Sequence, residues 1–240
     1  MRVLDLFSGI GGFSLGLESA GMETVAFCEQ DKFCQKVLAH HWPTLPIHSD
    51  ITELNGYEYR GSVELVCGGF PCQPFSVAGK QLGKEDDRAL WPEMLRVIRE
   101  VAPRWVIGEN VSGIIPMELD QVLSDLEGER YTCRTFVIPA CAVDAQHRRD
   151  RVWIMAHANG AGLQGRQEIR NSQRIRAHSY KQSERCADSI RPKVWQSESG
   201  ICRTLDGVPN RAHRLKALGN AVVPPLVAEI GRIVMEFDNA

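Results

Sequence analysis

The sequence predicts an α/β fold built on a parallel β-sheet, and three observations lead to that prediction. Short apolar runs alternate with helical patterns between residues 1 and 157, as strands and helices do in repeated βαβ units. Several apolar runs end in loops that hold glycine, proline or an acid, which is typical of the carboxyl edge of such a sheet. One run, Val152–Met155, is wholly apolar, as in a strand that is buried on both faces.

The predicted elements follow one another in a regular order. Apolar runs predict strands at Val3–Phe7, Thr24–Cys28, Val63–Cys67, Trp105–Gly108, Thr132–Ile138 and Val152–Ala156. Helical spacing and boundary residues predict helices between them at Phe13–Ser19, Lys32–His41, Arg88–Val101 and Leu119–Leu126. Two final helices are predicted at Ala212–Asn220 and Pro225–Phe237, the second with a proline in its first turn.

Composition and charge divide the chain into three regions. Its 240 residues, 43% hydrophobic and 24% charged, suit one large globular domain or one domain with a small appendage. We predict a main domain at 1–157, an insert at 158–203 and a segment at 204–240 that returns to the main domain. The insert holds nine basic and four acidic residues in a chain of net charge −2. Such a cationic segment is typical of a polyanion-binding appendage, although a solvated flexible insert has the same composition.

Other patterns argue against several classes of protein. The eight cysteines form no C-x-x-C pair, so neither a zinc site nor a disulfide framework is indicated. No apolar run approaches the roughly 18 residues of a membrane span. The N-terminal residues enter a strand pattern directly and do not resemble a signal peptide. We therefore expect a cytoplasmic protein with reduced thiols, no metal and no membrane partner.

One cysteine stands between two prolines in the loop GGFPCQPFS, residues 68–76. Each proline fixes its own φ angle, so the backbone around Cys72 is stiff and its thiol has a defined direction. A free thiol held at the edge of a sheet is typical of a nucleophile. A buried structural cysteine is the alternative interpretation.

Three successive strand ends carry residues that suit a nucleoside cofactor. The first leads into the glycine-rich turn DLFSGIGGF, residues 5–13, which lets the backbone approach a ligand but lacks the spacing of a phosphate-binding loop. Glu29 ends the second strand, where a carboxylate can accept both hydroxyl hydrogens of a ribose. Asp50 follows the next strand position and could accept from an adenine amino group. Together they favour a nucleoside-type cofactor over three unrelated surface acids.

A second group of polar residues lies downstream. Glu109, in the run GENV, ends a later strand and would face the same edge as Cys72. Partial burial would raise its pKa and let it share a proton with a substrate ring nitrogen, whereas a helix-capping or solvent-facing acid is the alternative. Asn110 beside it could brace the loop backbone. Arg149 and Arg151 are two residues apart, so we expect them to share one strand face, where they would clamp an anion or neutralise acidic groups. A surface charge cluster is the other interpretation.

These motifs, taken together, resemble the DNA (cytosine-5)-methyltransferase family. The resemblance rests on DLFSGIGGF, Glu29, Asp50, GGFPCQPFS, GENV, RRDRVWI and RLKALGNAVVP, in that order. It implies a Rossmann-like S-adenosylmethionine-dependent methyltransferase sheet with helices on both faces and a small, loop-rich target-recognition insert. The insert at 158–203 is very short for a recognition domain. Low sequence specificity, weak activity or dependence on a specificity partner are therefore expected.

The resemblance also implies a role for each matching residue. Cys72 corresponds to the nucleophile, and Glu109 to the acid that engages ring nitrogen 3 of cytosine. Arg149 and Arg151 correspond to an arginine pair near the flipped base. The implied cofactor-binding residues are Phe7, Ser8, Gly9, Gly11, Gly12, Glu29, Asp50, Ile51, Pro71, Asn220 and Val222.

The activity that the resemblance implies is methyl transfer from S-adenosylmethionine to carbon 5 of cytosine in double-stranded DNA. A covalent Cys72 adduct would form on a base that has left the duplex stack. Two alternatives remain open, an RNA cytosine-5 methyltransferase and a degenerate paralogue that binds S-adenosylmethionine or DNA with little activity. A bacterial or phage origin is expected, and a separate restriction endonuclease is one partner that the resemblance allows.

Overall fold

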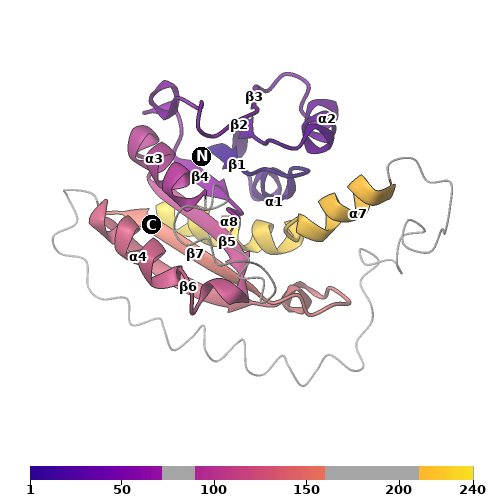
Figure 1. Cartoon of the computed structure of the whole chain (residues 1–240). Coiled ribbons are helices and arrows are strands. Elements are labelled where there is room, and N and C mark those ends of the chain that lie inside the picture. Colours follow the sequence, from indigo (N-terminus) through magenta and orange to yellow (C-terminus); the bar gives the residue numbers. More distant parts are fainter. Residues whose placement is uncertain (72–89, 160–210, 240) are drawn as a thin grey trace, which may run out of the picture.

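The computed structural model describes residues 1–71, 90–159 and 211–239, so Cys72 and most of the predicted insert lie outside the described residues. A seven-stranded sheet in the order β3-β2-β1-β4-β5-β7-β6 forms the centre of the domain (Figure 1). Its strands are β1 Arg2–Leu6, β2 Glu23–Cys28, β3 Ile47–His48, β4 Leu65–Gly68, β5 Trp105–Val111, β6 Tyr131–Ile138 and β7 Arg151–Ala158. The α-helices are α1 Gly12–Ser19, α2 Lys32–His41, α3 Trp91–Val101, α4 Leu119–Gly128, α7 Arg211–Asn220 and α8 Pro224–Asp238, with short 3-10 helices η1 Gly56–Tyr59, η2 Ser112–Ile114 and η3 Ala140–Val143.

The first five strands, β1 to β5, run parallel, and their register sets the position of the site. Leu6 is level with both Cys28 and Gly68, and Gly68 is level with Gly108. The loops that follow β1, β2 and β4, together with the last residues of β5, therefore meet at one edge. This edge is the carboxyl edge, where open α/β sheets bind their ligands.

One strand departs from the predicted parallel sheet. β7 is antiparallel to both of its neighbours, β5 and β6, so β6 runs in the same direction as β1 to β5 and the prediction of a parallel arrangement is wrong for β7 alone. β5 also continues past Gly108, the predicted end, to Val111. It continues because Glu109 pairs with Trp153, and Val111 with Arg151, on the antiparallel neighbour.

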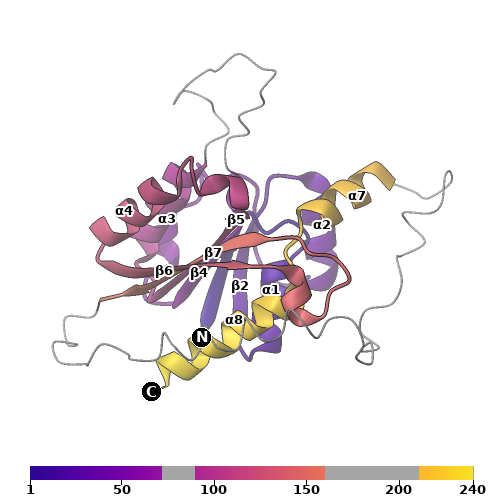
Figure 2. The ribbon, with the colours of Figure 1, turned by 90° about the horizontal axis from the view of Figure 1, so that it is seen from below.

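Helices cover both faces of the sheet, as the resemblance implied (Figure 2). α3 and α4 pack on one face, where Met94 and Val122 join a common apolar core. α1 and α8 pack on the other face, where they share a second core. Gly16 lets α1 and α8 approach closely, since a Cβ atom there would lie 2.5 Å from the Cβ of Val227. By length and composition alone the stretch Ala212–Asp238 could cross a membrane, but its second half, α8, is packed against this core.

Local sequence explains where the helices begin and end. Asp31 caps α2 by accepting from the backbone N–H of Phe33 at 2.8 Å, and the bounds of this helix are those predicted. α3 starts at Trp91 and has a proline in its first turn. It ends at Val101, and the next residue, Ala102, has a left-handed φ of 50° directly before Pro103.

Candidate functional site

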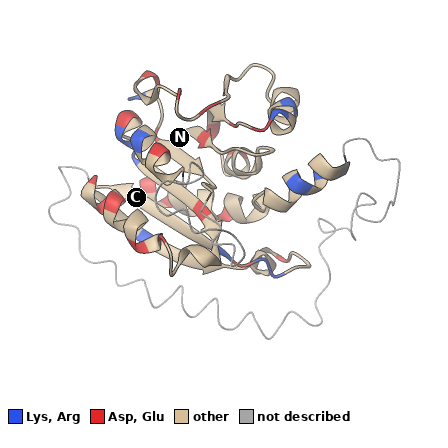
Figure 3. Cartoon of the chain, viewed as in Figure 1, with Lys and Arg blue, Asp and Glu red and all other residues tan. Residues whose placement is uncertain are grey.

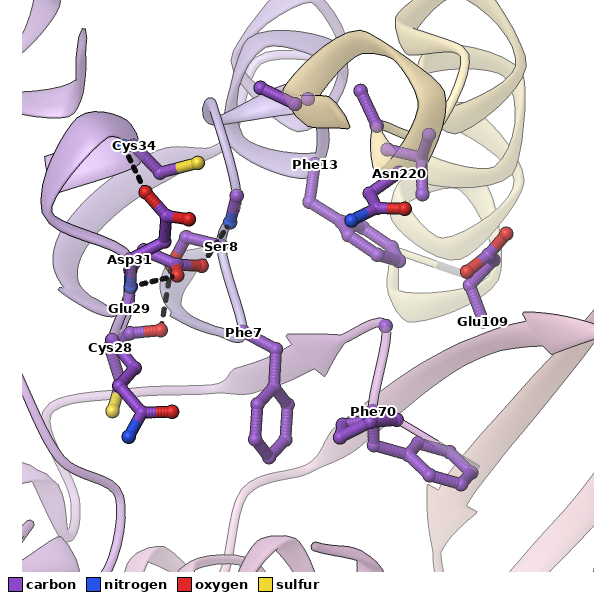
Figure 4. A pocket seen from close by; sticks show the side chains of 18 of the residues that line it. Phe7, Ser8, Phe13, Cys28, Glu29, Asp31, Cys34, Phe70, Glu109 and Asn220 are labelled. Atoms are coloured by element: carbon purple, nitrogen blue, oxygen red, sulfur yellow. Dashed lines mark hydrogen bonds between the residues drawn. The ribbon is translucent and has the colours of Figure 1, made fainter. Parts of the chain in front are cut away.

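One cavity of about 900 Å³ lies at the carboxyl edge of the sheet (Figure 4). It brings together residues from the glycine-rich turn, three acidic strand ends, the segment before Cys72 and the C-terminal region. The predicted site residues that line it are Phe7, Ser8, Gly9, Gly12, Glu29, Asp50, Ile51, Pro71, Glu109, Arg149, Arg151, Asn220 and Val222. Gly11 is not among the lining residues, and Cys72 lies outside the described part of the chain.

The glycine-rich turn curls tightly between β1 and α1. Phe7, Gly9 and Gly11 have φ angles of 52°, 55° and 85°, a region that disfavours side chains. Ser8 is buried, and its hydroxyl donates to the carbonyl of Asp5 at 2.7 Å. Its side chain therefore braces the turn through the backbone.

Two glycines of this turn serve helix packing. A Cβ atom on Gly11 would lie 2.6 Å from the ring of Trp42, which follows α2. A Cβ atom on Gly12 would lie 2.9 Å from Cγ2 of Val222, just before α8. The turn is thus held from two sides, by α2 and by the C-terminal segment.

Glu29 ties the first two strand ends together. One carboxylate oxygen accepts from the backbone N–H of Gly9 and the other from that of Asp31, both at 2.7 Å. Each carboxylate oxygen has two lone pairs, so each can still accept one ligand hydroxyl. Figure 4 shows Glu29 on the side of the cavity opposite Glu109.

Asp50 and Ile51 form the third strand end. Oδ1 of Asp50 accepts from the backbone N–H and the hydroxyl of Thr52, both at 2.8 Å, which lowers the pKa of this carboxyl below its usual value. Among the described residues none donates to the other oxygen, Oδ2, so it can accept from a ligand. Ile51 is buried and adds an apolar wall beside it.

Glu109 is a buried acid in an ion pair. Only 8% of the residue is exposed, and its Oε1 lies 2.9 Å from Nε of Arg151. Burial raises the pKa of Glu109, and the charges of Arg151 and Arg149 offset part of that rise. Gly69 leaves room for the carboxylate, because a Cβ atom there would lie 3.2 Å from Oε2. The predicted burial and raised pKa are confirmed.

Arg149 lines the same cavity, but it does not lie on the strand where we predicted it. Its φ of 38° is left-handed and β7 begins only at Arg151, so the prediction that the two arginines share a strand face is wrong. One terminal nitrogen of Arg149 donates to the carbonyls of Gly219 and Ala221, at 2.7 and 2.9 Å. Burial lowers the pKa of Arg149, and the neighbouring Arg151 charge lowers it further. Arg149 therefore fastens the C-terminal end of α7, which carries Asn220, to the side of the cavity where Glu109 lies.

Asn110 braces the segment that leads to Cys72. Its side-chain amide donates to the carbonyl of Phe70 at 2.9 Å, and its oxygen accepts from the backbone N–H of Val111. Pro71, the last described residue of this segment, lines the cavity. The predicted bracing role of Asn110 is confirmed.

Several polar residues around the cavity were not among those predicted. Asp5 is fully buried in β1 and accepts from the hydroxyl of Ser14 at 2.7 Å. Burial raises the pKa of Asp5 to about 7. Lys216 of α7 lies 3.2 Å from Asp31, which links α7 to α2 at the rim of the cavity. The one sequence signal for Asp5 was its position as an acid inside an apolar run. No sequence signal pointed to the contact between Lys216 of α7 and Asp31, the cap of α2.

Metal ligation has no support in the part of the chain that the structure describes. No three His, Cys, Asp or Glu side chains there form a group that could hold an ion.

Solved structures with a similar fold include two methyltransferases. A putative DNA modification methyltransferase encoded within an Escherichia coli prophage is 26% identical, with a TM-score of 0.57 over 66% of this chain and 47% of that chain. The S. pombe Dnmt2 methyltransferase is 22% identical, with a TM-score of 0.59 over 73% of this chain and 55% of that chain. These similarities define the class, a Rossmann-like methyltransferase fold.

Sequence relatives show which kind of methyltransferase this chain resembles. Type II methyltransferase M.HhaI of Haemophilus parahaemolyticus is 34% identical over 169 residues, which cover 68% of this chain and 51% of that protein. M.HgiCII of Herpetosiphon aurantiacus is 35% identical over 68% of this chain and 38% of that protein. M.AquIA of Picosynechococcus sp. is 32% identical over 68% of this chain and 74% of that protein.

The family model for the C-5 cytosine-specific DNA methylase matches residues 1–204. The chain therefore belongs to the C-5 cytosine-specific DNA methylase family. It spans about half or less of the length of several curated relatives that it matches.

Proposed function

We propose that this protein transfers a methyl group from S-adenosylmethionine to carbon 5 of cytosine in double-stranded DNA. One observation carries the proposal: a single cavity joins the glycine-rich turn and Glu29 to Glu109 and its arginine partner, Arg151. A methyl donor and an acceptor base need such a shared space, because the two must meet without intervening water. Membership of the family supports the same activity.

The residues of the cofactor side fit S-adenosylmethionine. Glu29 would accept from the ribose hydroxyls, while Asp50 and Ile51 would receive the adenine ring. The turn at Phe7 and Gly9, with its positive φ angles, would let the backbone approach the methionine part closely. When bound, S-adenosylmethionine supplies an electrophilic methyl group on its sulfonium centre.

The catalytic residues would activate a base that is not nucleophilic enough on its own. The Cys72 thiolate would form a bond to carbon 6 of the ring, which makes carbon 5 nucleophilic. Glu109 would share a proton with ring nitrogen 3, so that negative charge does not build up on the ring. Its raised pKa favours a proton on this acid, and Arg151 would hold it in place. After carbon 5 has gained the methyl group, loss of its proton restores the ring double bond and breaks the bond to Cys72.

The double-stranded substrate would bind mainly through charge. The predicted insert at 158–203 carries an excess of basic residues, which suits the phosphate backbone. The target base must leave the stack to reach a cavity at the edge of a sheet. We also propose a cytoplasmic bacterial or prophage protein, in which a separate restriction endonuclease or specificity partner completes the system.

Trapping on 5-fluorocytosine tests this proposal, because fluorine at carbon 5 cannot leave as the proton does. With S-adenosylmethionine, we expect a covalent complex with duplex DNA that survives denaturing electrophoresis. Cys72→Ser should abolish the complex, whereas Cys141→Ser, at a free thiol outside the cavity, should retain it. An adduct that persisted in Cys72→Ser, or a wild-type protein that formed none on duplex DNA, would overturn the proposal. Transfer RNA as a parallel acceptor separates the DNA from the RNA activity.

A further inference from the structure

The loop that presents Asp50 and Ile51 to the cavity is held by helix α3. The strand before this loop, β3, has only two residues, and the 3-10 helix η1 follows it at Gly56. The sheet therefore supplies little support for this loop. Three of its main-chain groups instead bond to two side chains of α3, Arg96 and Glu100.

Arg96 binds the loop through both terminal nitrogens of its guanidinium. One donates to the carbonyl of Ile51 at 2.6 Å, and the other donates to the carbonyl of Leu54 at 3.0 Å. The planar fork of an arginine can reach two carbonyls at the same time, which the single ammonium of lysine cannot do with the same geometry. The side chains of Ile51 and Leu54 are also buried. The loop is therefore held in two ways, by the packing of these side chains and by the bonds from Arg96 to its backbone.

Glu100 completes the attachment and holds Arg96 in position. One of its oxygens accepts from the backbone N–H of Gly56 at 2.8 Å, and both oxygens lie 2.8 Å from Nη1 of Arg96. Glu93, one turn earlier, lies 2.8 Å from Nε of Arg96. The mixed basic and acidic residues of α3 are visible in Figure 3. Burial would lower the pKa of Arg96, but Glu100 and Glu93 outweigh it and raise that pKa, so the guanidinium stays charged.

The sequence at Gly56 fits this attachment closely. A Cβ atom there would lie 2.8 Å from the Cβ of Glu100 and 3.0 Å from its Oε2. A side chain at this position would therefore push the loop away from α3. The glycine, the arginine and the glutamate act as one unit.

We propose that Arg96 and Glu100 are positioning residues for the cofactor: they fix the loop that carries Asp50 and Ile51, and so set the affinity for the adenosine part. This inference rests on the proposed function, since it takes S-adenosylmethionine as the ligand. Neither side chain lines the cavity. Arg96 and Glu100 would therefore act on affinity indirectly. They would raise the fraction of molecules in which the loop is arranged to bind the cofactor, and this fraction sets the apparent affinity.

Arg96→Met tests the proposal, because methionine keeps the apolar stem and removes all the donors. Binding of S-adenosylhomocysteine, measured by calorimetry, should weaken about tenfold, because the loop loses both of its charge-assisted bonds to Arg96 and only part of that loss reaches the ligand. Arg96→Lys should lie between Arg96→Met and the wild type. Arg99→Met is the matched control, since Arg99 lies on the same helix and its side chain pairs with Glu129, away from the loop. Its affinity should equal that of the wild type.

Two further measurements separate positioning from a general loss of structure. At saturating S-adenosylmethionine, kcat of Arg96→Met should stay near the wild-type value while KM for the cofactor rises. Amide exchange in the unliganded variant should rise at residues 51–56, with no change in β1 or β5. An unchanged affinity for S-adenosylhomocysteine in folded Arg96→Met would overturn the inference alone. If the wild type itself bound no S-adenosylhomocysteine, the proposed function would fail with it.

Discussion

The two sides of the cavity are stabilised in different ways. On the side where we propose that the cofactor binds, carboxylates accept from backbone N–H groups: Asp50 from that of Thr52, and Glu29 from those of Asp31 and Gly9. On the side that we propose to be catalytic, arginine side chains make the links. Arg151 pairs with Glu109, and Arg149 bonds to the backbone 70 residues further along.

We expect this difference to separate binding from chemistry. The carboxylates of Glu29 and Asp50 hold the backbone of the proposed cofactor pocket, so a change there should alter ligand affinity. The buried ion pair between Glu109 and Arg151 exists only when β5 and β7 have paired, and the bonds of Arg149 exist only when the C-terminal segment has docked. A change on the catalytic side should therefore alter the reaction or the stability of the whole domain.

The largest expected effect is on the reaction, from Glu109→Gln. Glutamine keeps the shape but cannot pass a proton to the ring, so methyl transfer should fall by about 10²- to 10⁴-fold. Binding of S-adenosylhomocysteine should remain at the wild-type level, because Glu29 lies on the other side of the cavity. Radiolabelled methyl transfer and calorimetry measure the two quantities. Glu127→Gln, an exposed position on α4, serves as the control. If Glu109→Gln also lost affinity for S-adenosylhomocysteine, binding and reaction would not be separated between the two sides of the cavity.

The next effect is on the pH dependence of stability, through Asp5. Its folded pKa of about 7 lies above the ordinary value of 3.8, so between these values the folded protein binds more protons than the unfolded chain. The free energy of unfolding should therefore fall as the pH rises toward 7, by about 2–3 kcal/mol between pH 5 and pH 8 from this group. Asp5→Asn should remove that part of the slope. Urea unfolding of both proteins at the two pH values measures it, and equal slopes would contradict the prediction.

A smaller effect is expected on cofactor affinity, from Glu29→Gln. The amide places an NH₂ group against one of two backbone donors and removes the charge. Affinity for S-adenosylhomocysteine should fall about 10- to 100-fold, the range expected when charge-assisted bonds are lost. The value of kcat at saturating cofactor should change little, which sharpens the contrast with Glu109→Gln. Glu23→Gln, exposed at the start of β2, provides a matched control by calorimetry.

The smallest effect is on stability, from Arg149→Met. This change removes the bonds to the carbonyls of Gly219 and Ala221, so the free energy of unfolding should fall by about 1–2 kcal/mol. Arg148→Met should have almost no effect, because its side chain is 83% exposed and its ion pair with Asp150 is on the surface. Urea unfolding of the two variants side by side makes the comparison. An Arg149→Met protein as stable as Arg148→Met would contradict the bracing role.

Much of the cofactor side could be predicted from the sequence because its signals are local. An aspartate cap and a following Trp-Pro pair fix both ends of α2, so its bounds are those predicted. Period-two and apolar patterns locate every main strand to within a few residues. Glu109 and Asn110 were also placed correctly, since both stand at the end of an unmistakable buried strand.

The remaining features depend on contacts that no local pattern records. The antiparallel pairing with β7 decides the length of β5, and the left-handed φ angle of Arg149 places this residue before the start of β7. Arg96 lies on an amphipathic helix, where the sequence pattern predicts that an arginine faces solvent. Its two carbonyl partners are evident only in the folded structure. A lone acid such as Asp5 gives no hint of its partner Ser14.

The reversed direction of β7 also has a topological consequence. At its end, Ala158 bonds to the carbonyl of Arg104, on the edge of the sheet remote from the cavity. α7, in contrast, starts at Arg211 and within one turn contributes His213 to the cavity. The covalent tether between Asn159 and Arg211 must therefore bridge a distance near the length of β7, about 25 Å at 3.3 Å per residue. Even when fully extended, a tether of fewer than about eight residues could not span this distance. A deletion that shortened it further would therefore displace α7 from the rim of the cavity.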